Sequence, residues 1–272
     1  MTAQEILRLF LRRGAFFYDE VAVEGSSLAD LDREGFESYI TAHYGTDLLD
    51  QMSLDRLLIN MKLARQEGTE TLLTVAGVLL FGRHPQRLLP YARISAVSFE
   101  GTELDEGGIL LSQEIEGRLD QMIEQAGVFL ARNNFVTSEM QGWRRVDRPQ
   151  YHRDALREAV VNAVAHRDYS ITTSQTRIFA FADRIEVRSP GRLPNTVTLD
   201  NIRVGLHAAR NPVLYTHLTQ MGYMKRVGIG IPTLVRLSRE LSGRDPHFEL
   251  VGEELRLTIW ARLPGNLQQQ QS

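Results

Sequence analysis

The first quarter of the chain has apolar residues at helical spacing. Residues 3–13 place four of them on one face, namely Ile6, Leu7, Phe10 and Leu11. A second helix is expected after Ser26 or Ser27, because a serine side chain can accept hydrogen bonds from the first N–H groups of a helix. Its apolar face would consist of Leu28, Leu31, Phe36, Tyr39 and Ile40. With a third helix after Ser53, these patterns predict a helical connecting segment over residues 1–65.

The middle of the chain contains both helix-like and strand-like patterns of apolar residues. Residues 74–81 form an apolar run that stops at a Gly-Arg-His-Pro sequence, which predicts a short buried helix. Residues 92–99 have strand character and precede Gly101. Residues 111–133 carry apolar side chains three and four positions apart, which predicts one long amphipathic helix. We expect a small α/β region over residues 66–150.

The last part begins near Tyr151 and has a mixed order of elements. A helix is predicted over 154–167, and two strands follow over 176–181 and 185–188, with a Pro/Gly loop after them. Two helices are then predicted over 212–221 and 231–241, and two last strands over 247–251 and 255–263. Such an order is typical of an α+β fold rather than of alternating βαβ units. We expect one domain over residues 151–264 and a disordered polar tail over 265–272.

Composition narrows the classes of function. The net charge of −3 and the pI of about 6.2 exclude a chain that holds nucleic acid or acidic membranes by overall charge. The chain has no cysteine, which excludes disulfides and thiolate zinc sites and agrees with a reducing compartment. The longest apolar stretch, residues 72–81, is too short to cross a bilayer. We therefore expect a cytoplasmic protein with no membrane partner.

Glu158 and Asn162 are the first residues with potential chemistry. They are four positions apart and share one face of a predicted helix whose valines can bury the other side. A carboxylate can orient a water molecule as a general base, and an amide oxygen is a suitable ligand for Mg²⁺. The alternative is that both residues lie on a solvated face. The next residues, 166–168 (His-Arg-Asp), are expected to close this helix, with Asp168 paired with Arg167 or capping the next turn, although they could instead line a pocket.

Two glycine-containing turns follow. Ser189 begins the loop 189–194 (Ser-Pro-Gly-Arg-Leu-Pro), in which Gly191 permits close approach of the backbone. Gly228 and Gly230 stand directly before an apolar helix, where exposed N–H groups can bind phosphate. Taken singly, each is equally well explained as an ordinary turn.

The order of these motifs resembles the conserved boxes of the GHKL ATPases, a class named after gyrase, a chaperone, histidine kinases and MutL. A closer resemblance covers nearly the whole chain and is carried by residues 76–86 (AGVLLFGRHPQ), 151–170 (YHRDALREAVVNAVAHRDYS), 183–194 (DRIEVRSPGRLP), 209–214 (ARNPVL) and 228–232 (GIGIP). These segments are similar to those of transcriptional regulators described as related to the C-terminal region of the RecG helicase.

The resemblance implies a Bergerat-like α/β sandwich that binds ATP and Mg²⁺. It makes Glu158 the water-activating base, Asn162 the magnesium ligand and Gly228 with Gly230 the phosphate loop, while Gly191 would line the adenine pocket. Ser189 stands where active members have the aspartate that binds the adenine amino group. The chain is thus expected to be a degenerate member in which ATP hydrolysis is slow or absent.

In such proteins an AlbA-like or Schlafen-like DNA-binding domain usually precedes this region, and we expect the chain to be a fragment or truncated member of that kind. DNA contact would then come through domains outside this chain, and a homo-oligomer is expected. The chain has no Gly-x-x-x-x-Gly-Lys-Ser/Thr phosphate loop, which excludes a helicase motor of that type.

Two other functions stay open. The domain could be a non-enzymatic scaffold for dimerisation with a vestigial nucleotide site. It could also bind DNA through a cluster of basic and aromatic residues over 143–157, namely Trp143, Arg144, Arg145, Arg148, Tyr151, His152, Arg153 and Arg157. The simpler interpretation of that cluster is a solvated face balanced by Asp147, Asp154 and Glu158.

Overall fold

The computed structural model describes residues 17–141, 143–194, 197–205, 208–224 and 228–262. The predicted helix at residues 3–13 and the predicted tail at residues 265–272 therefore lie outside the described residues. Among the residues described, no helix is long and apolar enough to cross a lipid bilayer.

The helix predicted after Ser27 is divided into two elements. Ser27 caps only a 3₁₀ turn, η2 (Leu28–Asp30), and the helix α2 (Arg33–Tyr44) begins anew from Asp32, whose side chain accepts a hydrogen bond from the Gly35 N–H. Between the two, the backbone pairs with a distant segment: the N–H of Asp32 donates to the carbonyl of Phe81 over 2.7 Å. These long-range hydrogen bonds replace the helical ones that the local pattern predicted.

Short elements complete the N-terminal part. A hairpin of β1 and β2, which the sequence patterns did not predict, leads into the buried helix α5, and Thr74 caps α5 by accepting from the Gly77 N–H. All seven residues of α5 are buried, which agrees with the apolar run. The bounds are η1 (Tyr18–Glu20), α3 (Asp47–Gln51), α4 (Leu54–Asn60), β1 (Ala64–Glu67), β2 (Glu70–Leu73), α5 (Val75–Phe81) and α6 (Pro85–Leu88).

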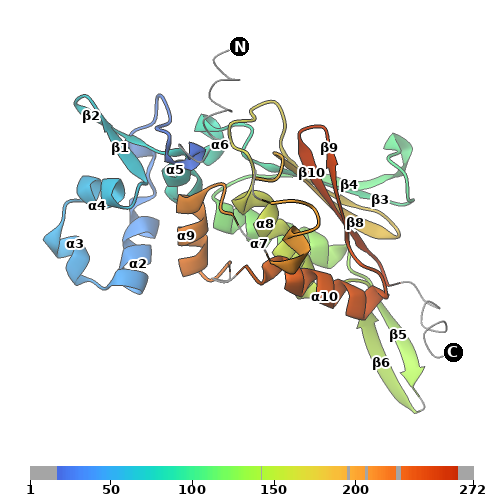
Figure 1. Ribbon diagram of the computed structural model, residues 1–272. Coiled ribbons are helices and arrows are strands. Elements are labelled where there is room, and N and C mark those ends of the chain that lie inside the picture. Colours follow the sequence, from blue (N-terminus) through green and yellow to red (C-terminus); the bar gives the residue numbers. More distant parts are fainter. Residues whose placement is uncertain (1–16, 142, 195–196, 206–207, 225–227, 263–272) are drawn as a thin grey trace.

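The main sheet of the molecule has six strands of mixed direction (Figure 1), in the order β4-β3-β7-β8-β10-β9. Only β3 and β7 run parallel; all other neighbours are antiparallel. The sheet thus joins strands from the predicted middle region to strands from the predicted nucleotide-binding region. The bounds are β3 (Ile94–Phe99), β4 (Ile109–Ile115), β7 (Thr176–Ala180), β8 (Arg184–Pro190), β9 (His247–Val251) and β10 (Glu254–Trp260), and a turn η3 (Glu106–Gly108) precedes β4.

Helices cover one face of this sheet, which makes the fold the α+β sandwich that the order of elements predicted. They are α7 (Leu119–Arg132), α8 (Arg153–Ala165) and α10 (Gly230–Ser242), while α9 (Pro212–Gln220) packs between α8 and α5. A short turn, η4 (Ile202–Val204), lies against α10. The prediction of one helix over 111–133 was wrong at its start, because residues up to Ile115 pair with β3 as the strand β4. The Gln86 side chain then bonds both backbone groups of Gly117, and α7 begins after that turn.

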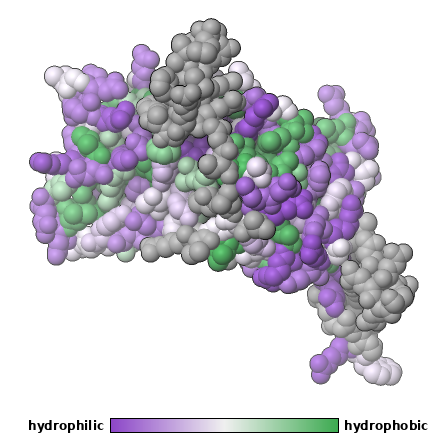
Figure 2. Space-filling model, in the orientation of Figure 1, coloured by the Kyte–Doolittle hydropathy of each residue, from purple (hydrophilic) through white to green (hydrophobic). Residues whose placement is uncertain are grey.

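A second hairpin, β5 (Val136–Gln141) and β6 (Arg144–Pro149), extends away from the body of the molecule (Figure 1). On the face shown in Figure 2, apolar residues form separate small areas among hydrophilic ones.

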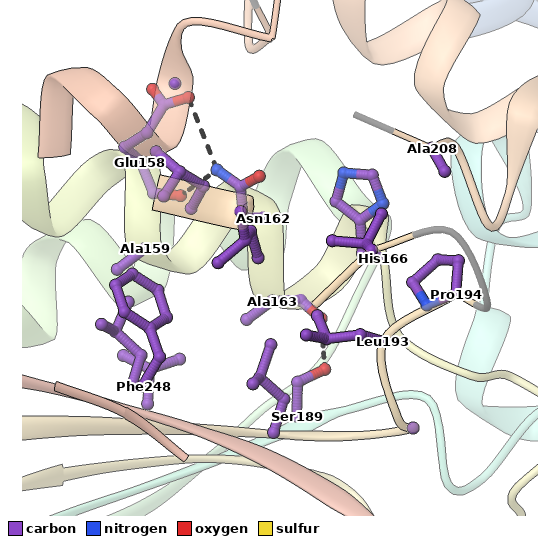
Figure 3. Close-up of a pocket in the computed structure, with 18 of the residues that line it drawn as sticks. Glu158, Ala159, Asn162, Ala163, His166, Ser189, Leu193, Pro194, Ala208 and Phe248 are labelled. Atoms are coloured by element: carbon purple, nitrogen blue, oxygen red, sulfur yellow. Dashed lines mark hydrogen bonds between the residues drawn. The ribbon is translucent and has the colours of Figure 1, made fainter. Parts of the chain in front are cut away.

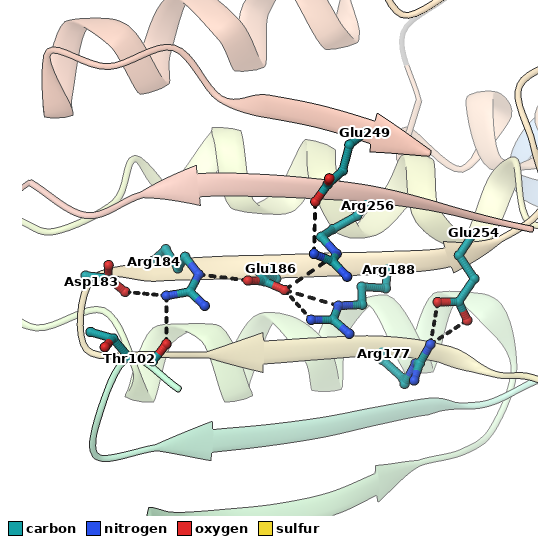
Figure 4. Close-up of polar contacts among 9 residues, drawn as sticks. All are labelled: Thr102, Arg177, Asp183, Arg184, Glu186, Arg188, Glu249, Glu254 and Arg256. Atoms are coloured by element: carbon teal, nitrogen blue, oxygen red, sulfur yellow. Dashed lines mark hydrogen bonds and ion pairs between the residues drawn. The ribbon is translucent and has the colours of Figure 1, made fainter. Parts of the chain in front are cut away.

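The face of the sheet opposite the helices carries a layer of ion pairs (Figure 4). Glu186 lies at its centre and accepts hydrogen bonds from Arg184 at 2.7 Å and from Arg188 at 2.6 Å, with Arg256 at 3.9 Å. Burial opposes the charge of this carboxylate, but the hydrogen bonds from Arg188 and Arg184 outweigh burial and hold the pKa of Glu186 below its ordinary value. The guanidinium groups of Arg184 and Arg188 also cover the rings of Phe181 and Phe179.

Replacing Glu186 by alanine is expected to destabilise the fold by about 3 kcal/mol, because partly buried guanidinium groups would lose their common counter-ion. The control is Glu240→Ala, which removes one partner of the exposed pair Arg236–Glu240 and should cost less than about 1 kcal/mol. Urea unfolding of both variants measures the difference. Equal midpoints for the two variants would contradict a structural role of the Glu186 network.

Candidate functional site

One cavity lies between α8, the end of β8 and the start of α10 (Figure 3). Its lining includes all six residues predicted as site residues, namely Glu158, Asn162, Ser189, Gly191, Gly228 and Gly230. The space open to water is about 110 Å³, whereas one water molecule needs about 10 to 15 Å³. The cavity is therefore large enough for a group bigger than a single water. The structure brings these residues together, and the roles assigned to them remain predictions.

Asn162 presents its amide group at the cavity wall. The side-chain nitrogen donates to the backbone carbonyl of Glu158 at 2.7 Å and lies 3.4 Å from the Glu158 carboxylate. Because this assigns the nitrogen to the Glu158 side, the amide oxygen points away from it, as Figure 3 shows. An acceptor oxygen on this face of α8 is suited to a hard cation.

Glu158 is buried, with 5% of the residue exposed, and its carboxylate lies against the first residue of α10. A methyl group added to Gly230 would lie 2.0 Å from the Glu158 Oε1 atom, so this approach requires a glycine. A carboxylate in this place also has the favourable interaction of an anion with a helix N-terminus. Glu158 thus lies at the close contact between α8 and the start of α10.

Ser189 and Gly191 form the wall at the end of β8. The Ser189 hydroxyl donates a hydrogen bond to the backbone carbonyl of Ala163 at 2.7 Å and so ties the strand to α8. Gly191 has φ of +119°, and a Cβ atom there would lie 2.6 Å from the Cβ of Asp168. Both the conformation and the close approach require glycine, which gives the turn at residues 189–194 its physical reason.

The rest of the cavity wall is largely apolar. The side chains come from β8, β9, β10 and from the segment between β8 and α10, and they include Val187, Val197, Ile202, Met224, Phe248 and Leu257. Such a wall favours a flat, apolar or aromatic group over a strongly hydrated one. Phe248 had no local signal in the sequence, because it comes close to α8 only through the pairing of β9 with β10.

The residues that end α8 have separate functions. His166 lines the cavity, and its position four residues after Asn162 is the signal that identifies it. Arg167 is buried and donates to the carbonyls of Ile171 and Ser174, with its guanidinium against the rings of Tyr91 and Tyr169. The structural role expected for this residue is therefore seen.

Of the two roles expected for Asp168, pairing with Arg167 or capping the next turn, the structure shows the cap. Asp168 accepts from the Ser170 N–H at 3.1 Å, which caps the next turn as predicted, but its ion pair is with Arg210 at 2.8 Å. Arg210 also donates to the carbonyl of Arg192, and Asn211 donates to the carbonyls of Ala165 and Arg167 at the end of α8. The segment 209–214 thus joins the end of α8 to the turn after β8.

The predicted cluster over residues 143–157 does not form one surface. Tyr151 is only 2% exposed, so it cannot stack on a base, because it belongs to the core beneath α8. His152 accepts from the Asp154 N–H at the start of α8, and Arg157 donates to the Gly222 carbonyl. Trp143, by contrast, is fully exposed.

The mixed sheet and its helices form an α+β sandwich that is consistent with an ATPase-like fold. Residues 173–259 match the family described as "Putative ATP-dependent DNA helicase recG C-terminal", and residues 10–95 match a domain of unknown function. The first match begins after α8, so it covers Ser189, Gly191, Gly228 and Gly230 but neither Glu158 nor Asn162.

Among solved structures, the chain is similar to the crystal structure of the DIP2311 protein from Corynebacterium diphtheriae. The TM-score is 0.67 and the sequence identity 21%, and the match covers 96% of this chain but 51% of that one. The likeness therefore shows a shared fold, and this chain spans about half the length of that protein. No curated protein matches the chain.

Proposed function

We propose that this chain binds an adenine nucleotide together with Mg²⁺ in the cavity between α8, β8 and α10. The observation that carries the proposal is the convergence of three separate motifs on one cavity: the polar face of α8, the glycine turn after β8 and the glycines at the start of α10. The family match over residues 173–259 supports the same assignment.

The base would lie against the apolar wall near Ser189. Because the Ser189 hydroxyl already donates its proton to Ala163, toward the cavity it can only accept a hydrogen bond. An acceptor fits the exocyclic amino group of adenine and not the carbonyl of guanine. A neutral hydroxyl binds more weakly than a carboxylate, and a loss of about 1 to 3 kcal/mol would weaken affinity roughly 5-fold to 150-fold.

The phosphates and the cation would lie toward Asn162 and the start of α10. Among the described residues, no three histidine or carboxylate side chains gather around a common point where they could hold a metal. Mg²⁺ would therefore be held by the Asn162 amide oxygen and by oxygens of the nucleotide itself, which is a usual arrangement for this ion.

Hydrolysis is proposed to be slow or absent. A general base needs a water molecule within hydrogen-bond reach, whereas the carboxylate of Glu158 is packed against Gly230. Glu158→Gln separates the two roles of this residue. If it acts as a base, the variant binds ATP but loses any phosphate release; if it only joins the helices, the variant is less stable and its turnover per folded molecule is unchanged.

Binding of MgATP is expected to raise the melting temperature. At a nucleotide concentration ten times the Kd, the stabilisation is about 1.4 kcal/mol, or about 3 °C for a domain of this size. Asn162→Ala should abolish the shift, while the control Asn60→Ala, at an exposed amide in α4, should retain it. MgGTP should give a smaller shift than MgATP. Scanning calorimetry of the three proteins, each compared with its own ligand-free sample, provides the measurement.

No shift at millimolar MgATP would exclude this proposal, and an equal shift for Asn162→Ala would exclude the assigned cation ligand.

We further propose that nucleotide binding serves a DNA-associated transcriptional regulator in the cytoplasm, by changing the assembly of a homo-oligomer. The packing of Glu158 against Gly230 supports a second possibility, a non-enzymatic scaffold, because it links α8 to α10 without a ligand. Sedimentation velocity with and without MgATP distinguishes the two. A nucleotide-dependent change of mass supports the regulator, and an oligomer that is indifferent to nucleotide supports the scaffold.

A further inference from the structure

The hairpin of β5 and β6 is here called the arm. Its two strands form a sheet of their own, separate from the six-stranded sheet, and it extends beyond the helices and the sheet (Figure 1). A two-stranded hairpin by itself is marginally stable in water. At its tip Trp143 is 100% exposed, and at its base Phe135 and Val136 are exposed. These features indicate a surface that a partner covers.

The charge of the arm differs from that of the rest of the chain. Residues 132–153, which include the arm and its two ends, contain five arginines and two acidic residues, a formal charge of +3. Since the whole chain has −3, the remainder has −6. The partner of the arm is therefore expected to be negatively charged.

Three arginines of this segment, Arg132, Arg144 and Arg153, have exposed side chains, and none of them takes part in an ion pair among the side chains that the structure describes. Many arginines elsewhere are paired, as Arg33 is with Glu37 and Arg236 is with Glu240. Arg132 and Arg153 lie at the base of the arm, and Arg144 lies toward its tip. Because a strand of six residues spans about 20 Å, these positive charges are distributed along the arm.

We propose that the arm binds the major groove of double-stranded DNA. A B-form major groove admits a two-stranded β-ribbon, and arginines along the ribbon can meet the phosphates at its edges. A second copy of this chain is disfavoured as the partner, because besides Pro149 only three of the strand residues are apolar, Val136, Met140 and Val146. The inference does not depend on nucleotide binding, since the cavity and the arm share no residues.

Fluorescence anisotropy tests the proposal. The probe is a labelled DNA duplex of arbitrary mixed sequence, and its binding is measured over a range of KCl concentrations. The double variant Arg144→Gln with Arg153→Gln should bind about tenfold more weakly at low salt, and its logarithmic salt slope should be smaller by about 1.8. The matched control is Arg33→Gln with Arg236→Gln, which removes the same charge from exposed, ion-paired positions and should leave both quantities unchanged. All variants should keep the wild-type melting temperature.

Trp143 gives a second, direct signal. The chain has two tryptophans, and the other, Trp260, lies under the Arg244 guanidinium at 3.7 Å. In a Trp260→Phe background, addition of DNA should change the emission of Trp143. Asn162→Ala should bind DNA like wild type, so failure of the nucleotide proposal would leave this one intact.

Four results would overturn the proposal: no binding to the duplex, an unchanged salt slope in the arm variant, equal affinity for an A-form RNA duplex, or binding confined to anionic vesicles. The RNA duplex is the sharpest control, because its major groove is too deep and narrow for a ribbon.

Discussion

Replacing Gly77 by alanine is expected to destabilise the fold by about 3 kcal/mol. Gly77 lies in the buried helix α5, and a methyl group there would lie 1.9 Å from the carbonyl oxygen of Leu63. That oxygen cannot easily move aside, because it accepts a hydrogen bond from the Thr74 N–H at 2.9 Å. Relief of the clash would have to separate α5 from the loop before β1. Urea unfolding gives the change in free energy.

The matched control is Gly127→Ala in α7. This glycine is also helical, but it is exposed and nothing lies within 4 Å of an added Cβ atom. Alanine should therefore stabilise the protein there by about 0.5 to 1 kcal/mol, since it favours the helix and restricts the unfolded chain. Opposite signs for two glycine-to-alanine changes in helices are the expected result. If Gly77→Ala were neutral, the close packing of α5 on Leu63 would be disproved.

Asp19→Asn is expected to lose about 3 kcal/mol of stability relative to the wild type between about pH 6.5 and 4. Two buried groups at α9, the Asp19 carboxylate and the His217 imidazole, have pKa values shifted in opposite directions. The Asp19 carboxylate accepts from the N–H groups of Val213 and Leu214, at 2.8 and 3.1 Å, and burial raises its pKa to about 6. His217 lies one turn later, its Nδ1 2.6 Å from the Tyr39 hydroxyl, and burial lowers its pKa to about 4.

The two contributions have opposite signs. Asp19 binds a proton more tightly in the folded state, so its contribution to stability grows as the pH falls from about 6 to 4. His217 binds a proton more tightly in the unfolded state, so stability is lost as the pH falls from about 6.5 to 4. Each shift of two to two and a half pKa units corresponds to about 3 kcal/mol, and in the wild type the two nearly cancel.

The variants separate these contributions. Asp19→Asn leaves His217 alone, so the variant should lose about 3 kcal/mol between pH 6.5 and 4 relative to the wild type. His217→Gln leaves Asp19 alone and should gain a similar amount over the same range. Urea titrations at each pH, expressed as differences from the wild type, remove the effect of the other carboxylates. Parallel pH profiles for all three proteins would show that neither group is shifted as described.

Local sequence patterns were sufficient to predict elements whose backbone hydrogen bonds lie within the element itself, as in a helix. The helices α8, α9 and α10 lie within one or two residues of their predicted bounds, because their apolar spacing is a local feature, and α9 and α10 also have proline or glycine at their ends. For the same reason the i, i+4 relation of Glu158 to Asn162 was evident before the fold was known. The prediction failed at β4, since an apolar run of that length suits a helix or a strand and its pairing with β3 decided between them.

The sequence by itself thus determined the α+β order of elements and the residue types that could hold a nucleotide. Only the tertiary structure decided that Gly230 lies against Glu158, that Phe248 completes the cavity, and that Asp19 caps a helix 194 positions further along the chain. The physical reason is that such contacts are made by hydrogen bonds and packing between distant segments. Helical and strand periodicity records which face of each element is buried, but not which other element buries it.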